Sequence, residues 1–163
     1  MLEGEQNLGL LKEQEHLKRV ERDPKELAQE YVTHLEQHPL DTEAREKLAV
    51  VYAEHYGRLD LASDQLEQLI QQPNQPSKLV VHWLNLLADL QVRAGADYES
   101  VKQTLQRIVE REPNLAAAQI ALRRLSRLKL ELKANEKSQG VKMGDYEQNI
   151  GLKQGGRSGF PPS

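Results

Sequence analysis

Three prolines each close a run of residues with helical periodicity, and this punctuation constrains the chain more than any other feature. Pro39 and Pro73 are 34 residues apart, and Pro113 follows 40 residues later. Before each proline, apolar residues recur every three or four positions, which is the spacing of one face of an α-helix. Proline cannot continue a helix interior because it lacks the amide hydrogen and its ring clashes with the preceding turn. The pattern predicts short helices joined by tight turns.

The expected helix starts and stops agree with this punctuation. Aspartate and serine are good N-cap residues, and we expect four helices to begin at Asp23, Asp41, Ser77 and Asp97. Gly57 and Gly95 are expected to end helices, because glycine adopts the left-handed conformation at little cost. Six short helices are predicted, the last running from Asn114 to about Lys133.

Composition supports an all-α chain and removes several classes of function. Aromatic residues make up only 4% of the 163 residues, so the runs that β-sheets need are scarce. The absence of cysteine excludes disulfides, thiol nucleophiles and Cys-type zinc sites. The sole tryptophan, Trp83, lies among leucines and is predicted to be a core residue.

The spacing also supports a resemblance to the tetratricopeptide repeat family, whose unit is a pair of helices with small and large apolar residues at set positions. In residues 42–73 the matching positions are Leu48, Ala49, Tyr52, Ala62, Leu66, Leu69 and Pro73. In residues 78–113 they are Leu87, Ala88, Tyr98, Val101, Leu105, Ile108 and Pro113. The chain departs from the family at Gln91, where a tyrosine is usual. The resemblance implies a right-handed α-hairpin solenoid of about two and a half repeats over residues 23–133.

Such an array implies a non-enzymatic surface that binds a peptide or a partner protein in its concave groove. The resemblance places ten residues there: Glu43, Glu46, Val50, Glu54, His82, Asn85, Asp89, Arg93, Ile120 and Arg124. Glu46 and Val50 occupy positions where some members carry the Lys and Asn of a carboxylate clamp, so that clamp is not expected. Each residue taken alone is also compatible with an ordinary solvated helix surface.

No catalytic, cofactor or metal site is predicted. His34 and His38 have the spacing of two metal ligands on one helix face, but no third ligand accompanies them, and surface histidines are the preferred interpretation. No glycine-rich phosphate loop or nucleophile motif occurs. We therefore expect neither an enzyme nor a bound cofactor.

The two ends of the chain share a hexapeptide outside the predicted repeats. Residues 5–10, EQNLGL, recur as EQNIGL in residues 147–152. We expect residues 1–22 to be a helix or linker and residues 134–163 to be a flexible tail. The candidate docking motif in that tail consists of Tyr146, Glu147, Gln148, Asn149, Ile150 and Leu152. This motif is expected to dock into a groove, either its own or that of a neighbouring copy, so that the chain self-associates. Coincidental repetition and simple local structure are the alternatives.

Charge is unevenly distributed along the chain. Residues 1–39 and 40–73 each carry a net charge of −4, residues 74–113 are neutral, and residues 114–163 carry +5. Arg123, Arg124, Arg127 and Lys129 are predicted to make the last helix basic on one side. Binding of RNA or an anionic membrane surface through this helix and the tail is the alternative function, although nucleic acid is disfavoured by the acidic half. No membrane span or leader segment is expected, which suggests a cytoplasmic protein or the soluble part of a larger membrane-tethered one.

Overall fold

The computed structural model describes residues 23–158 of the chain, with side chains for residues 23–140. Every element in this range is a helix, and the all-α prediction is confirmed for it. The helices are α2 (Pro24–Gln37), α3 (Thr42–Tyr56), α4 (Leu59–Gln71), α5 (Ser77–Arg93), α6 (Tyr98–Arg111) and α7 (Ala116–Ser158). The chain divides into two compact units, Met1–Pro73 and Asn74–Ser163. The helix or linker expected over residues 1–22 lies outside the described residues.

The predicted helix ends are confirmed at most positions. Asp23, Asp41 and Asp97 each accept a hydrogen bond from a backbone amide in the first turn, at 3.1, 3.1 and 2.9 Å. Helices α2, α4 and α6 each end two residues before Pro39, Pro73 and Pro113. Gly57 and Gly95, which follow α3 and α5, have φ angles of +60° and +76°. These local features hold because caps and prolines act on the backbone next to them.

The prediction that Ser77 caps α5 is wrong. Helix α5 begins at Ser77 itself, and the carbonyl of Pro76 accepts hydrogen bonds from the amides of Leu79 and Val80 at 2.9 and 3.2 Å. The Ser77 hydroxyl instead donates to the carboxylate of Glu112, just after α6. The Ser77 hydroxyl therefore bonds to a residue 35 positions away in sequence and does not cap α5.

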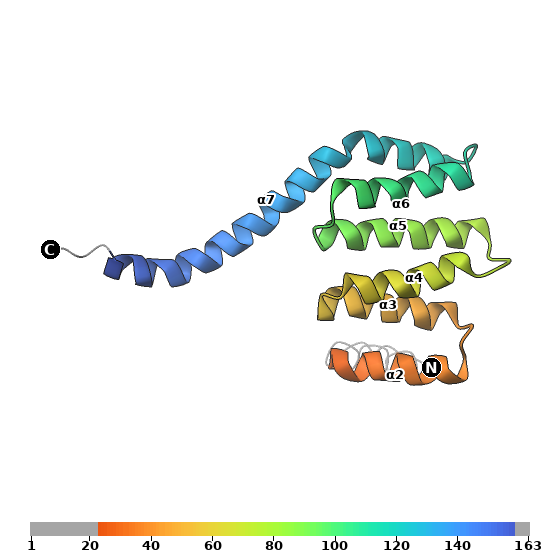
Figure 1. Cartoon of the computed structure of the whole chain (residues 1–163), viewed down its shortest axis with the longest axis horizontal. Helices are drawn as coiled ribbons and strands as arrows, with labels where there is room; N and C mark the ends of the chain where they lie inside the picture. Colours follow the sequence, from red (N-terminus) through yellow and green to blue (C-terminus); the bar gives the residue numbers. More distant parts are fainter. Residues whose placement is uncertain (1–22, 159–163) are drawn as a thin grey trace, which may run out of the picture. The chain divides into compact units, whose positions relative to one another are not determined.

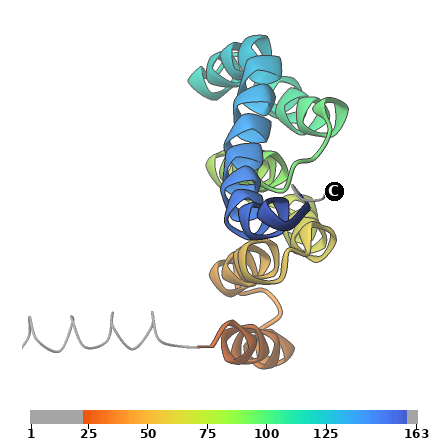
Figure 2. The same cartoon turned by 90° about the vertical axis from the view of Figure 1, so that its left-hand side faces the viewer.

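In the first unit, α3 packs against both α2 and α4 (Figure 1; Figure 2, where these helices are seen nearly end-on). Ala49, Ala62 and Leu66 are fully buried. Leu35 and Leu48 belong to a cluster against which Tyr31, Val32 and Tyr52 pack. Arg45 on α3 also donates to the side chains of Gln65 and Gln68 on α4 and to the carbonyl of Pro39, at 2.8, 2.7 and 3.1 Å. Apolar burial and one arginine therefore hold α3 at the centre of this unit.

In the second unit, α6 packs against both α5 and α7 (Figure 1). The buried side chains of these three helices include Trp83, Leu84, Leu87, Ala88, Val101, Leu105, Ile108, Ala118, Ala121 and Leu128. The prediction that Trp83 is a core residue is confirmed, because its side chain is almost completely buried. Each unit has a buried Leu-Ala pair, which is Leu48-Ala49 in α3 and Leu87-Ala88 in α5.

Helix α7 is longer than the sequence predicts. The sequence predicts an end near Lys133, but the helix extends to Ser158, so that predicted end is wrong. Asn135 and Gln139 each donate a side-chain hydrogen bond, both 2.8 Å long, to the backbone carbonyls of Val92 and Arg93 at the end of α5. The carbonyl of Val92 also accepts the amide of Gly95 at 3.1 Å. The two side-chain hydrogen bonds therefore give α7 anchors beyond Lys133 that the local sequence does not reveal.

Within the part of the chain that the structure describes, no helix has the length and apolarity required to cross a bilayer.

The conformation of Gly57 generates a stability prediction. Gly57→Ala is expected to lower the free energy of unfolding by about 1 kcal/mol, because a Cβ disfavours the left-handed conformation. Gly140 lies within α7, and an added Cβ there would meet nothing within 4 Å. Gly140→Ala is the matched control and should raise the free energy of unfolding by about 0.5–1 kcal/mol, because alanine restricts the unfolded chain. Urea denaturation followed by circular dichroism measures both, and effects of the same sign would contradict this assignment.

Candidate functional site

The predicted groove residues of α3 lie along one face of that helix. Glu43, Glu46, Val50 and Glu54 follow one another at intervals of three or four residues, the repeat of a helical face. Glu43 and Glu54 are exposed, whereas Glu46 and Val50 are half-buried. Glu43 forms an ion pair with Lys47, with 2.7 Å between Oε1 and Nζ. The α3 row, meaning these four residues, is therefore an accessible and mainly acidic strip.

The predicted groove residues of the second unit come from α5 and α7. His82, Asn85, Asp89 and Arg93 share one face of α5, and Ile120 and Arg124 lie one turn apart on α7. We call these six residues the α5–α7 row. Arg124 joins the two helices through a 2.7 Å ion pair with Asp89. The structure thus brings together one pair of these residues, Asp89 and Arg124.

Arg124 is held by two carboxylates. The guanidinium of Arg124 also lies 2.8 Å from Oε1 of Glu131, which is about two turns further along α7. Burial lowers the pKa of Arg124, but the hydrogen bonds with Glu131 and Asp89 outweigh this effect and raise the pKa above its usual value. The Arg124 side chain is only 22% exposed. This residue therefore acts first as a bridge between α5 and α7.

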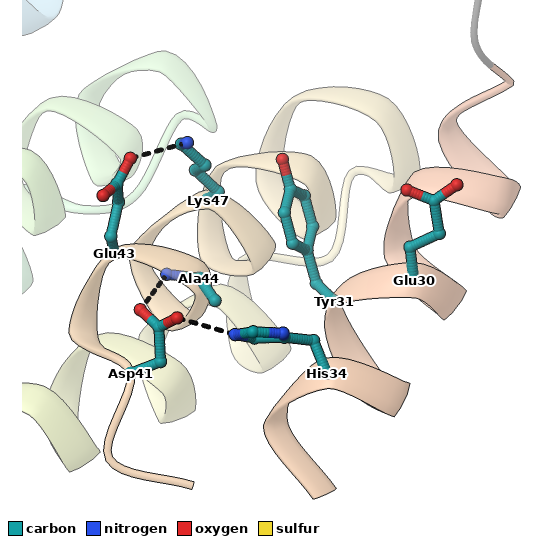
Figure 3. Close-up of a pocket in the computed structure, with 7 residues that line it drawn as sticks. All are labelled: Glu30, Tyr31, His34, Asp41, Glu43, Ala44 and Lys47. Carbon is teal, nitrogen blue, oxygen red and sulfur yellow. Dashed lines mark hydrogen bonds and ion pairs between the residues drawn. The ribbon is translucent and has the colours of Figure 1, made fainter. Parts of the chain in front are cut away.

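A hollow that the sequence did not predict lies between α2 and α3 (Figure 3). Its volume is about 440 Å³, and it is lined by Glu30, Tyr31, His34, Asp41, Glu43, Ala44 and Lys47. Nε2 of His34 lies 2.6 Å from Oδ2 of Asp41, while Oδ1 of Asp41 accepts the amide of Ala44 at 3.1 Å. The hollow shares Glu43 with the α3 row, so the two form a continuous acidic surface. The sequence contains one indication of it, namely a histidine seven residues before a capping aspartate, with a proline turn between them.

Asp41 is the electrostatic centre of this hollow. The backbone hydrogen bond from Ala44 and the side-chain hydrogen bond with His34 both lower the pKa of Asp41 below its usual value. The ionised carboxylate of Asp41 therefore both caps α3 and joins α3 to α2 through His34.

His34 and His38 are neighbours in the structure, as their spacing suggested. Their ring centroids are 4.8 Å apart, and the rings are tilted by 39°. Among the residues that the structure describes, no group of three or more His, Asp or Glu side chains is placed to hold a metal ion. The contact of His34 with Asp41 gives this histidine a structural partner between α2 and α3.

The prediction that four cationic residues share one side of α7 is wrong. Arg124 turns toward Asp89, and Nζ of Lys129 lies 5.4 Å from the centre of the Tyr98 ring at the start of α6. Arg123 and Arg127 are exposed and lie one turn apart. The helix therefore divides these cations among different faces, because a residue at position 129 is rotated well away from positions 123 and 127.

Gln91 is the clearest departure from the resembled family in the second unit. Its Oε1 atom is buried and has no hydrogen-bond partner among the described residues. Buried polar atoms without partners are uncommon in folded proteins. In the described part of the chain, Gln91 therefore leaves an unsatisfied acceptor in the interior of the second unit.

The side chains of the docking motif, Tyr146, Glu147, Gln148, Asn149, Ile150 and Leu152, lie outside the described residues, although their backbone belongs to α7. The first copy of the hexapeptide, in residues 5–10, also lies outside them.

Comparison of the chain with models of protein families, with curated proteins and with solved structures found no match.

The lowered pKa of Asp41 predicts a pH dependence of stability. The ionised carboxylate is favoured in the folded state, so its contribution is complete above about pH 4, the usual pKa of aspartate, and is lost as the pH falls through the lowered pKa. Asp41→Asn keeps a residue that can cap α3 but removes this titration. We expect the variant to lose stability less steeply than the wild type below about pH 4. Urea denaturation at several acidic pH values measures this, and identical slopes would contradict the prediction.

The bridge between α5 and α7 predicts an energetic coupling. A double-mutant cycle with Arg124→Met and Asp89→Asn should give a coupling energy of about 0.5–1 kcal/mol, which is the upper part of the range for partly exposed ion pairs. Urea denaturation of the wild type, the two single variants and the double variant supplies the four free energies of unfolding. Strict additivity would show that the pair contributes nothing to the docking of α7.

Proposed function

We propose that the chain is a non-enzymatic protein-interaction module with tetratricopeptide-like repeats arranged in a right-handed solenoid. In this proposal the α3 row and the α5–α7 row bind an extended peptide or a segment of a partner protein. We also propose a cytoplasmic location, or a place in the soluble part of a larger membrane-tethered protein.

The observation that carries the proposal is the burial of small residues at equivalent positions in the two units. Ala49 in α3 and Ala88 in α5 both have no exposed surface, and each follows a buried leucine. Small residues at such positions allow neighbouring helices to approach closely, which is the packing that helical repeats require. The second helix of each hairpin supports the same interpretation, because Ala62, Leu66 and Leu69 in α4 are buried, as are Val101, Leu105 and Ile108 in α6.

The charges of the two rows support a ligand that carries both basic and acidic groups. Three of the four residues of the α3 row are glutamates, and Lys47 forms an ion pair with one of them, Glu43. The α5–α7 row contributes Arg93 as well as the Asp89–Arg124 pair. We therefore propose that a basic part of the ligand lies on α3. Electrostatic complementarity of this kind favours one binding direction over the other.

One ligand available within the chain is the hexapeptide EQNIGL of residues 147–152. If it docks in a groove of another copy, the module would self-associate as well as bind partners. The alternative, RNA or anionic membrane binding, is less well supported, because Arg124 and Lys129 are engaged within the unit.

The proposal is tested by selecting binders from a displayed random-peptide library with the full chain as bait. The selected peptide should bind at least tenfold more weakly to the double variant Glu46→Lys, Arg93→Glu, which reverses one charge in each row. Fluorescence anisotropy of the labelled peptide gives the dissociation constants.

The matched control is Asp64→Lys, Arg111→Glu, which makes the same charge changes at exposed positions of α4 and α6. This control should bind the peptide as the wild type does. Equal weakening in the two double variants, or a selection that yields no specific peptide, would reject the rows as the binding surface.

A further inference from the structure

Helix α7 presents an exposed face on the side away from α6. Arg123, Arg127, Leu130 and Ala134 are all exposed and follow one another at intervals of four, three and four residues. We call these four residues the α7 outer stripe. Leu130 is 70% exposed, although a leucine gains free energy when its side chain leaves water. Together with Arg124 and Glu131, three of them line a hollow of about 480 Å³.

Helix α2 presents a face with the same spacing and the opposite charge. Glu26, Glu30, Thr33 and Gln37 are exposed and also follow one another at intervals of four, three and four residues. We call these residues the α2 outer face. With Gln29 and His34 they line a hollow of about 560 Å³. This face lies away from α3, which is the helix that α2 packs against in its unit.

We propose that the α7 outer stripe of one chain binds the α2 outer face of a second copy. The two arginines of the stripe and the two glutamates of the face are each four residues apart, a rise of about 6 Å in both helices. Parallel pairing of the two helices therefore sets each guanidinium opposite one carboxylate. Arginine and carboxylate form the strongest ion pairs, because two parallel hydrogen bonds join them.

The apolar part of the stripe fits the same occupant. Leu130 and Ala134 continue the stripe beyond the arginines, and Thr33 and Gln37 continue the face beyond the glutamates. Leu130 would then lie over Thr33 in the hollow on α2, where the methylene groups of Glu30 and Gln37 can cover it. The contact joins different surfaces of two identical chains, so it leaves a free stripe at one end and a free face at the other. Such head-to-tail contacts produce rings or open chains rather than closed two-fold dimers.

This contact is separate from the binding rows proposed above, since none of its eight residues belongs to the α3 row or the α5–α7 row. Its ion pairs are exposed, so they are screened by salt. We therefore expect weak association of the full chain at low ionic strength, with an average mass that rises with protein concentration. The association should be lost at about 1 M salt, where the Debye length is about 3 Å.

A charge-exchange experiment tests the pairing directly. Variant one carries Arg123→Glu and Arg127→Glu, and variant two carries Glu26→Lys and Glu30→Lys. Each variant alone has two outer surfaces of like charge, so each should sediment as a monomer at concentrations where the wild type associates. A mixture of the two should associate again, because each then finds a complementary surface on the other. Sedimentation velocity at matched concentrations measures all three samples.

The control variant Lys78→Glu, Arg111→Glu reverses two exposed cations on α5 and α6. It should associate as the wild type does, and circular dichroism should show the same helix content in every variant. A wild-type chain that stays monomeric at low salt and high concentration would overturn the proposal, as would a mixture that remains monomeric. Association that survives the charge reversals in either single sample would also overturn it.

Discussion

The packing of α3 and α5 depends on two alanines that have no exposed surface, Ala49 and Ala88. Each puts only a methyl group at a fully buried position of its helix. A larger side chain would push the neighbouring helix outward, because interaxial distances follow the side chains at the contact. The face of α3 and of α5 that carries the alanine is buried. The α3 row and the four α5 residues of the α5–α7 row lie on a different face of their helix. The candidate binding surface is therefore a consequence of the packing.

Charge has two different roles in this molecule. Inside each unit it fastens helices, as Asp41 does between α2 and α3 and Arg124 does between α5 and α7. These groups have shifted pKa values because their partners favour the ionised forms. On the outside, glutamates on α2 and arginines on α7 remain exposed. The segregation of acidic and basic residues along the chain thus gives internal bridges and also two outer surfaces that complement each other.

The binding rows and the outer surfaces would allow one chain to combine two kinds of contact. The proposed ligand contacts lie on α3, α5 and one side of α7. The α7 outer stripe lies on another side of α7, and the α2 outer face lies on α2. Because the two sets share no residue, binding of a peptide and association of copies would be energetically separable. A module with this arrangement could present several identical rows side by side, which raises the apparent affinity for a repeated ligand.

The helical class, the Asp caps, the proline-closed ends and the buried Leu-Ala positions can be predicted from the sequence, because each depends on a few neighbouring residues and on helical periodicity. The packing of the helices sets where Ser77 donates its hydroxyl, how far α7 continues and which cations of α7 share a face. It also decided that His34 and Asp41 line one hollow. In these cases a hydrogen bond, a ring contact or helix packing joins residues on different elements, as between Ser77 and Glu112 or between Asn135 and Val92. Local patterns cannot specify such partners, since the distance between them is set by how the helices pack.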